Sequence, residues 1–160
     1  MKTLILYYSY EGHTKLLADY LAVQLHCDIE RIMPVKEMKS TGFSKFFWGG
    51  SQVVMNIKPT IAELAHRPED YDQILIGSPI WAGNYAPAIG TLLNSGLISN
   101  KKVGYFYTHE GGEGRSVDRF IQNLGFDNQF IGACSCMNVQ KEPETVKQQL
   151  LAWALEHLAD

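Results

Sequence analysis

Short apolar runs alternate with amphipathic segments along the whole chain, and this alternation limits the choice of fold. Continuous apolar runs are typical of strands that are covered on both faces. We predict such strands over residues 4–8, 27–32, 74–77, 103–107 and 130–136, of which the second is the weakest. Apolar residues recur every three or four positions elsewhere, which predicts helices over residues 13–25, 86–93, 116–124 and 143–158.

A strand–helix alternation of this kind predicts a parallel sheet with helices on both faces. The chain has 160 residues and shows no separating linker, so we expect one domain over residues 1–160. Residues 33–71 exceed the length of one crossover, and we expect a helix plus irregular chain there. For Phe46, Phe47 and Trp48 in this stretch we expect core packing, with ligand capping or a partner contact as alternatives.

Composition excludes several classes of protein. With 46% hydrophobic and 19% charged residues, the chain is not expected to be disordered. No apolar run approaches the ~20 residues of a membrane-spanning helix, and the N-terminal run is too short for a signal peptide, so we expect a cytoplasmic protein without membrane contact. A net charge of -3 argues against nucleic acid as a partner, and three cysteines argue against a disulfide framework.

The chemistry of such a fold is expected at the carboxyl ends of its strands. The loop after the first strand leads directly into a helix, whose first N–H groups are unpaired and carry partial positive charge. A phosphate could bind there, aided by hydroxyl groups. This first loop comprises Ser9, Tyr10, Glu11, Gly12, His13 and Thr14. It matches neither GxxxxGK nor GxGxxG, which excludes an NTPase P-loop and a dinucleotide fingerprint. The alternative is an ordinary helix start capped by Ser9 or Thr14.

Two further loops follow the strands that should meet at the same edge. The second loop places Trp81 directly after a buried strand, where an indole can stack on a planar ligand or simply pack in the core. It comprises Pro79, Ile80, Trp81, Ala82, Gly83, Asn84 and Tyr85. The third loop is glycine-rich, which allows close approach of backbone to a ligand, or simply a mobile connection. It comprises Thr108, His109, Glu110, Gly111, Gly112, Glu113 and Gly114. Their shared edge favours one common ligand site.

The sequence resembles the flavodoxin family in all three loops. The stretch YYSYEGHTKLLADYLA is similar to the family's phosphate loop, and IGSPIWAGNYAPAI is similar to its second flavin loop. The stretch YFYTHEGGEG resembles the third loop of the family's glycine-rich, single-domain branch. The resemblance implies an α/β, flavodoxin-like three-layer sandwich. It also implies a five-stranded parallel sheet of order 2-1-3-4-5 and one noncovalent FMN.

The resemblance also implies a role for each loop. Residues 9–14 would hold the 5′-phosphate, mostly by backbone N–H groups and hydroxyls. Residues 79–85 would border the isoalloxazine, with Trp81 against one face, and residues 108–112 would meet its pyrimidine edge. Glu11 stands where the family commonly has a hydroxyl, so we expect its side chain to point to solvent. His13 replaces the usual Asn and could donate to the phosphate. No catalytic residue or metal ligand is assigned.

Three functions are considered. The first is an FMN-binding electron-transfer protein that serves a redox partner protein, in which Glu110 and Glu113 near the pyrimidine edge lower the flavin potential. The second is an FMN-dependent NAD(P)H oxidoreductase acting on quinone-like small-molecule acceptors, because the third loop lacks an aromatic residue to cover the flavin. The third is a binding module without flavin. Cys134 and Cys136 should share one strand face, as buried thiols or as a redox pair.

Overall fold

The computed structural model describes residues 1–36 and 58–158. Phe46, Phe47 and Trp48, and the expected helix around them, lie outside the described residues. The described strands are β1 (Thr3–Tyr7), β2 (Asp28–Arg31), β3 (Gln73–Trp81), β4 (Asn84–Tyr85), β5 (Lys102–His109) and β6 (Gln129–Met137). The described helices are α1 (His13–Leu25), α4 (Pro87–Leu93), α5 (Ser116–Asn123), α6 (Pro143–Leu158) and the 3₁₀ helix η1 (Pro68–Asp70).

The predicted sheet is confirmed. Its strands run in the order β2-β1-β3-β5-β6, and all neighbours on this path pair in parallel. One strand was not predicted: β4 pairs antiparallel with the end of β3, which makes a sixth strand off the main path. The β3–β4 hairpin extends the sheet at its carboxyl edge, on the side where the three loops lie.

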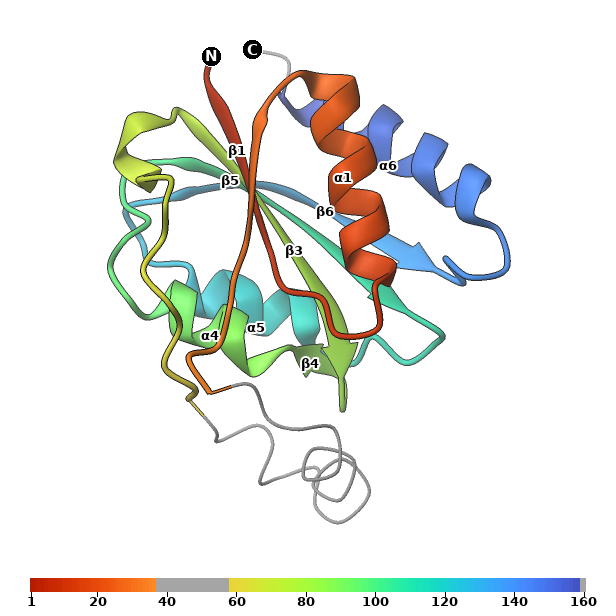
Figure 1. The fold of residues 1–160 in the computed structure, drawn as a ribbon, viewed down its shortest axis with the longest axis horizontal. Helices are drawn as coiled ribbons and strands as arrows, with labels where there is room; N and C mark the ends of the chain where they lie inside the picture. Colours follow the sequence, from red (N-terminus) through yellow and green to blue (C-terminus); the bar gives the residue numbers. More distant parts are fainter. Residues whose placement is uncertain (37–57, 159–160) are drawn as a thin grey trace.

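Helices cover both faces of the sheet, as Figure 1 shows. Side chains alternate along β1: Leu4 and Leu6 join the core under α4 and α5, whereas Ile5 and Tyr7 join the core under α1 and α6. This confirms the three layers. The same alternation puts Cys134 and Cys136 on the α1–α6 face of β6, where both are buried with their Sγ atoms 4.0 Å apart.

The centre of the sheet contains a glycine that makes room for an aromatic ring. Gly77 on β3 pairs with Phe106 on β5. A Cβ built on Gly77 would lie 2.3 Å from Cζ of Phe106, a distance that real Cβ atoms do not show. The Phe106 ring therefore occupies the space of the missing side chain and joins the core under α1 and α6.

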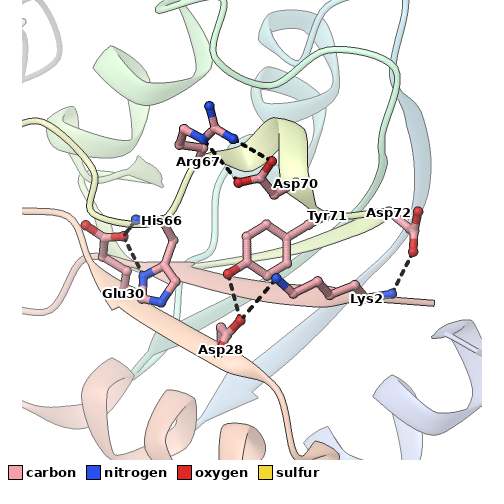
Figure 2. A network of polar contacts seen from close by, with 8 residues as sticks. All are labelled: Lys2, Asp28, Glu30, His66, Arg67, Asp70, Tyr71 and Asp72. Atoms are coloured by element: carbon pink, nitrogen blue, oxygen red, sulfur yellow. Dashed lines mark hydrogen bonds and ion pairs between the residues drawn. The ribbon is translucent and has the colours of Figure 1, made fainter.

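Polar contacts fasten the edge strand β2 to the chain that returns to β3 (Figure 2). The Tyr71 hydroxyl donates to Asp28 Oδ2 at 2.7 Å, and Lys2 Nζ lies 4.2 Å from the centre of the Tyr71 ring. The hydrogen bond from Tyr71, helped by the charge of Lys2, lowers the pKa of Asp28. Burial, followed by the contact with Asp28, raises the pKa of Tyr71.

A second set of contacts at this edge is made by Glu30, two residues further along β2. Glu30 accepts the backbone N–H groups of Ala65 and His66, each at 2.8 Å, and its Oε2 lies 3.0 Å from His66 Nδ1. Figure 2 shows Glu30 and His66 facing each other beside the Asp28–Tyr71 pair. These bonds hold the edge strand at two points. Among the helices of residues 1–36 and 58–158, none is both long and apolar enough to cross a membrane.

Candidate functional site

A cavity of about 400 Å³ opens where the carboxyl ends of β1, β3 and β5 meet. Its volume lies within the range of small-molecule sites. Among the described residues, those that line it all come from the three loops predicted from the sequence: Ser9, Tyr10, Glu11, His13, Thr14, Pro79, Ile80, Trp81, Ala82, Gly83, Thr108, His109, Glu110, Gly111 and Gly112. Of the predicted site residues, Gly12, Asn84 and Tyr85 do not line it.

The first loop is shaped by backbone geometry. Gly12 is the N-cap of α1 with φ 101°, a conformation that favours glycine, and no side chain caps the helix. The alternative of a Ser9 or Thr14 cap is therefore wrong. Instead, Ser9 Oγ accepts the Gly12 N–H at 3.2 Å, and Arg31 Nη2 donates to the Ser9 carbonyl at 2.7 Å. The start of α1 thus lies at the cavity with its partial positive charge.

The first and third loops are joined by a buried pair of hydroxyls. Thr14 Oγ1 and Thr108 Oγ1 are 2.8 Å apart, and both residues are almost fully buried while lining the cavity. Each hydroxyl keeps capacity for two further hydrogen bonds, because it has one proton and two lone pairs and the shared bond uses one of these three. The pair therefore fixes the spacing of two cavity walls and still offers polar atoms to a ligand.

Trp81 is held by two tyrosine rings, one from the residue after β1 and one from the first loop. The Tyr8 and Tyr10 rings meet its indole edge-on, at centroid distances of 5.5 and 6.0 Å. Trp81 is only 9% exposed, whereas Tyr10 is 45% exposed. The indole is therefore held in one orientation at the wall of the cavity, a geometry typical of preferred aromatic contacts.

The second loop proves to be a tight hairpin. Pro79, Ile80 and Trp81 are the last residues of β3, and Trp81 pairs with Asn84 across a two-residue turn. Ala82 and Gly83 both have positive φ, 50° and 73°, as in a type I′ turn. This turn matches the twist of the strands and gives the aromatic wall a rigid base.

The hairpin also contacts the third loop. The Gly83 carbonyl accepts the Arg115 N–H at 3.1 Å. A Cβ built on Gly114 would lie 2.6 Å from Gly83 Cα, so this approach requires glycine at position 114. Each loop therefore touches both of the others: the first and second at Tyr10 and Trp81, the first and third at Thr14 and Thr108, and the second and third here.

The third loop begins later than predicted, because β5 continues through Thr108 and His109. Gly111 and Gly112 have φ of 135° and 76°, and no atom of residues 1–36 or 58–158 lies within 4 Å of a Cβ built on either. This part of the loop is open to solvent at the cavity mouth, beside the exposed Glu110. The expected solvent exposure of Glu11, on the opposite rim, is also observed.

Glu113 lies away from the cavity. It accepts the Tyr107 hydroxyl at 2.5 Å and the Ser135 hydroxyl at 3.3 Å. Burial, followed by the bond to Glu113, raises the pKa of Tyr107 to about 12. The sequence did not predict the contact of Ser135 with Glu113 or that of Arg31 with the Ser9 carbonyl, because neither Ser135 nor Arg31 lies in a loop or in a recognisable motif.

Asn84 and Tyr85 support the site without lining it. Tyr85 is buried in the core under α4 and α5, where its ring meets that of Phe120 edge-on at 6.3 Å. Asn84 Oδ1 is buried and has no hydrogen-bond partner among the described residues. The neighbouring Ala86 N–H donates to Ser78 Oγ at 2.9 Å, which ties the start of α4 to β3.

The arrangement fits a ligand with an anionic end and a planar, largely apolar end. The anionic end matches the start of α1, with the hydroxyls of Ser9 and Thr14 nearby. The planar end matches the wall formed by Pro79, Ile80 and Trp81. Beside it, the exposed backbone of the third loop offers hydrogen-bonding groups to a polar edge. FMN has these features, so the residues present fit this cofactor.

The model of a family described as Flavodoxin matches residues 2–150. A protein of Bacteroides eggerthii assigned as a flavoprotein has a similar fold, with a TM-score of 0.80 at 23% identity over 99% of both chains. A flavoprotein of Lactobacillus acidophilus, solved in complex with FMN, gives a TM-score of 0.70 at 26% identity over 91% of this chain and 97% of that one. The apo-form of the Lactobacillus acidophilus flavoprotein gives 0.60 at 26% identity over 88% and 95%. No curated protein matches the sequence.

Proposed function

The chain belongs to the flavodoxin family, and from this premise we propose that it binds FMN in the cavity of about 400 Å³ and serves in electron transfer. The observation that carries the proposal is the convergence of the three loops on this cavity, each fastened to the others. The FMN complex of the Lactobacillus acidophilus flavoprotein supports the choice of cofactor. When bound, FMN supplies the capacity to accept and deliver electrons.

The first loop is proposed to hold the phosphate. The N-terminus of α1 provides unpaired N–H groups and a partial positive charge of roughly half an elementary charge. Ser9 and Thr14 add hydroxyl groups, and the half-buried His13 lines the same part of the cavity. Arg31, from β2, donates to the Ser9 carbonyl. Arg31 therefore supports the shape of the loop through its backbone and is not proposed to contact the ligand.

The second loop is proposed to border the isoalloxazine. Trp81 presents an aromatic surface that Tyr8 and Tyr10 hold in place, and Pro79 and Ile80 extend the apolar wall. This wall excludes water from one side of the ring system. The two-residue turn at Ala82 and Gly83 forms the end of this wall.

An absorption and fluorescence titration tests cofactor binding. Bound FMN should show perturbed absorption bands and quenched fluorescence, and an unperturbed spectrum would overturn the proposal. Anaerobic reduction then tests the role. An electron carrier should be reduced stepwise by dithionite, through a one-electron reduced form, and should not respond to NADPH.

One observation favours the second candidate, an FMN-dependent NAD(P)H oxidoreductase for quinone-like acceptors. The cavity mouth at Gly111 and Gly112 is open, and these residues carry no side chain to cover a bound flavin. A nicotinamide must lie on the exposed flavin face for hydride transfer, with the reacting atoms ~3–3.5 Å apart. Rapid bleaching of bound FMN by NADPH alone would favour this function over electron transfer between proteins.

A further inference from the structure

A chain of hydrogen bonds lies behind the third loop and reaches the cavity through His109. Glu113 accepts the hydroxyl protons of Tyr107 and Ser135. Ser135 Oγ lies 2.8 Å from His109 Nε2, and His109 Nδ1 accepts the Gly111 N–H at 3.1 Å. The His109 side chain is only 8% exposed. The network thus connects a carboxylate outside the cavity to a backbone amide at its mouth.

The contacts assign one tautomer to His109. A serine hydroxyl has a single proton, and Ser135 gives it to the Glu113 carboxylate, which can only accept. The Ser135 oxygen must therefore accept from His109, so Nε2 carries the proton. The other ring nitrogen is then unprotonated, as its bond from the Gly111 N–H requires. The contacts of both ring nitrogens therefore indicate a neutral imidazole protonated at Nε2.

This tautomer fixes the peptide between Glu110 and Gly111. The N–H and C=O of a trans peptide point in opposite directions. Because the Gly111 N–H is directed at His109, the Glu110 carbonyl is directed away from His109. This peptide can therefore offer a ligand an acceptor but no donor. The pyrimidine edge of an isoalloxazine has one N–H between two carbonyls, and an acceptor in the loop matches that N–H.

We infer that His109 is the positioning residue of the third loop: its neutral ring holds the Gly111 amide for flavin binding, and protonation of the ring releases it. The inference rests on the proposed function. A second proton on Nδ1 would place two donors face to face and break the bond. Gly111 and Gly112 have no side chains to hold the loop in place. Flavin affinity should then fall as the solution becomes acidic.

Polar and charged groups from three elements and the third loop surround the His109 ring. Glu113 Oε2 lies 3.9 Å from His109 Nε2 and is the nearby carboxylate on the third loop. Tyr107 of β5 stacks on the ring at 5.7 Å, and its raised pKa of about 12 keeps it neutral between pH 5 and 9. From β6, Ser135 contacts the ring, and from α6 the neutral Gln149 donates to the Ser135 carbonyl at 3.0 Å.

The test compares FMN dissociation constants of the wild-type protein and His109→Asn between pH 5 and 9. An asparagine can place its amide oxygen near the position of Nδ1, where it accepts the Gly111 N–H but cannot be protonated. The FMN phosphate and His13 are present in both complexes. Their contribution therefore cancels in the ratio of the two constants.

We expect the ratio of wild-type to His109→Asn dissociation constants to rise about three- to tenfold from pH 8 to pH 5, the effect of one lost hydrogen bond. His26→Asn is the matched control, because His26 is exposed at the far end of α1. Its ratio to wild type should not change with pH. A ratio for His109→Asn that is equally flat would overturn the inference. A wild-type protein that binds no FMN at any pH would instead overturn the proposed function.

A second measurement does not depend on flavin or on the folding of a variant. The ¹⁵N shifts of the His109 ring in the wild-type protein report its tautomer directly. We expect the Nε2-protonated form at pH 8 and its conversion to the doubly protonated ring in acid, with a change in the Gly111 amide signal over the same range. An Nδ1-protonated ring at pH 8, or a Gly111 signal that ignores the conversion, would overturn the inference.

Discussion

Thr14 and Thr108 share a hydrogen bond between their hydroxyls, 2.8 Å long and buried, although 94 positions separate them in the chain. The bond joins the start of α1 to the end of β5. Because both residues line the cavity, it sets the distance between two of its walls. The site therefore depends on a contact within the protein as well as on its exposed loops.

The costs of replacing these two threonines should not add, because their hydroxyls are partners in one hydrogen bond. Thr14→Val leaves the Thr108 hydroxyl buried without its partner, which we expect to lower the free energy of unfolding by about 1–3 kcal/mol. The double variant Thr14→Val/Thr108→Val removes both polar groups and should cost less than the sum of the single variants. Urea unfolding followed by circular dichroism measures all three. Strictly additive costs would show that the two hydroxyls do not interact.

Trp81→Leu should weaken FMN binding. Aromatic contacts contribute about 0.5–1.5 kcal/mol beyond buried area, so we expect the dissociation constant to rise about three- to tenfold. Trp153→Leu, on α6, should lower stability without changing this constant. Quenching of FMN fluorescence gives both values. An unchanged affinity in Trp81→Leu would show that the indole does not contribute to FMN binding.

Glu110→Gln should raise the reduction potential of bound FMN. The carboxylate is exposed at the cavity mouth, where its negative charge opposes the addition of electrons. Solvent and salt screen the charge, so we expect a rise of about 10–40 mV. Glu156→Gln is the control, because Glu156 is exposed near the C-terminal end of α6. Anaerobic redox titration at low salt distinguishes the two, and equal potentials in both variants would contradict the role of Glu110.

The contact between Asp28 and Tyr71 should make the free energy of unfolding depend on pH in acidic solution. The pKa of Asp28 is lower in the folded state, so its contribution is complete above its ordinary pKa and is lost as the pH falls through the folded-state value. Tyr71→Phe removes the hydrogen bond that is the largest cause of this shift. The variant should therefore lose less stability than wild type between pH 5 and pH 2. Urea unfolding at successive pH values measures this, and parallel profiles would refute the assignment.

Ala82→Asn should stabilise the hairpin at the second loop. Ala82 has φ 50°, a region that costs residues with a Cβ about 1–2 kcal/mol, whereas asparagine followed by glycine is favoured in type I′ turns. We expect a gain in the free energy of unfolding of about 0.5–1 kcal/mol. Gly83→Ala, at φ 73°, is the opposite change and should destabilise the protein. Thermal unfolding of the two variants should move in opposite directions.

The strands and helices could be predicted because their signals are local. Apolar runs such as Leu4–Tyr8 identify strands regardless of their neighbours, and the helix over residues 13–25 has the predicted ends. Strand ends were less predictable. The predicted second loop begins at Pro79, yet Pro79 lies within β3 and pairs with Thr108. The two residues of β4 are too few to show a pattern of alternation.

The site could be predicted as three loops but not as a set of contacts. Parallel topology brings the loops to one edge, and this requires only the order of the strands. The bonds within the site join distant parts of the chain. Thr14 suggested a local cap, but its hydroxyl binds Thr108, and Arg31 reaches the first loop from the neighbouring strand. No local pattern contains such information.

The fit of Phe106 over Gly77 has a consequence for how relatives of this chain can diverge. With a Cβ at position 77 only 2.3 Å from the ring, position 77 cannot accept a side chain while position 106 keeps its phenylalanine. A side chain at position 77 becomes acceptable only after the residue at 106 has become smaller, and a smaller residue at 106 first leaves a cavity. The two positions should therefore covary, with glycine opposite large aromatic rings and alanine or larger residues opposite small ones.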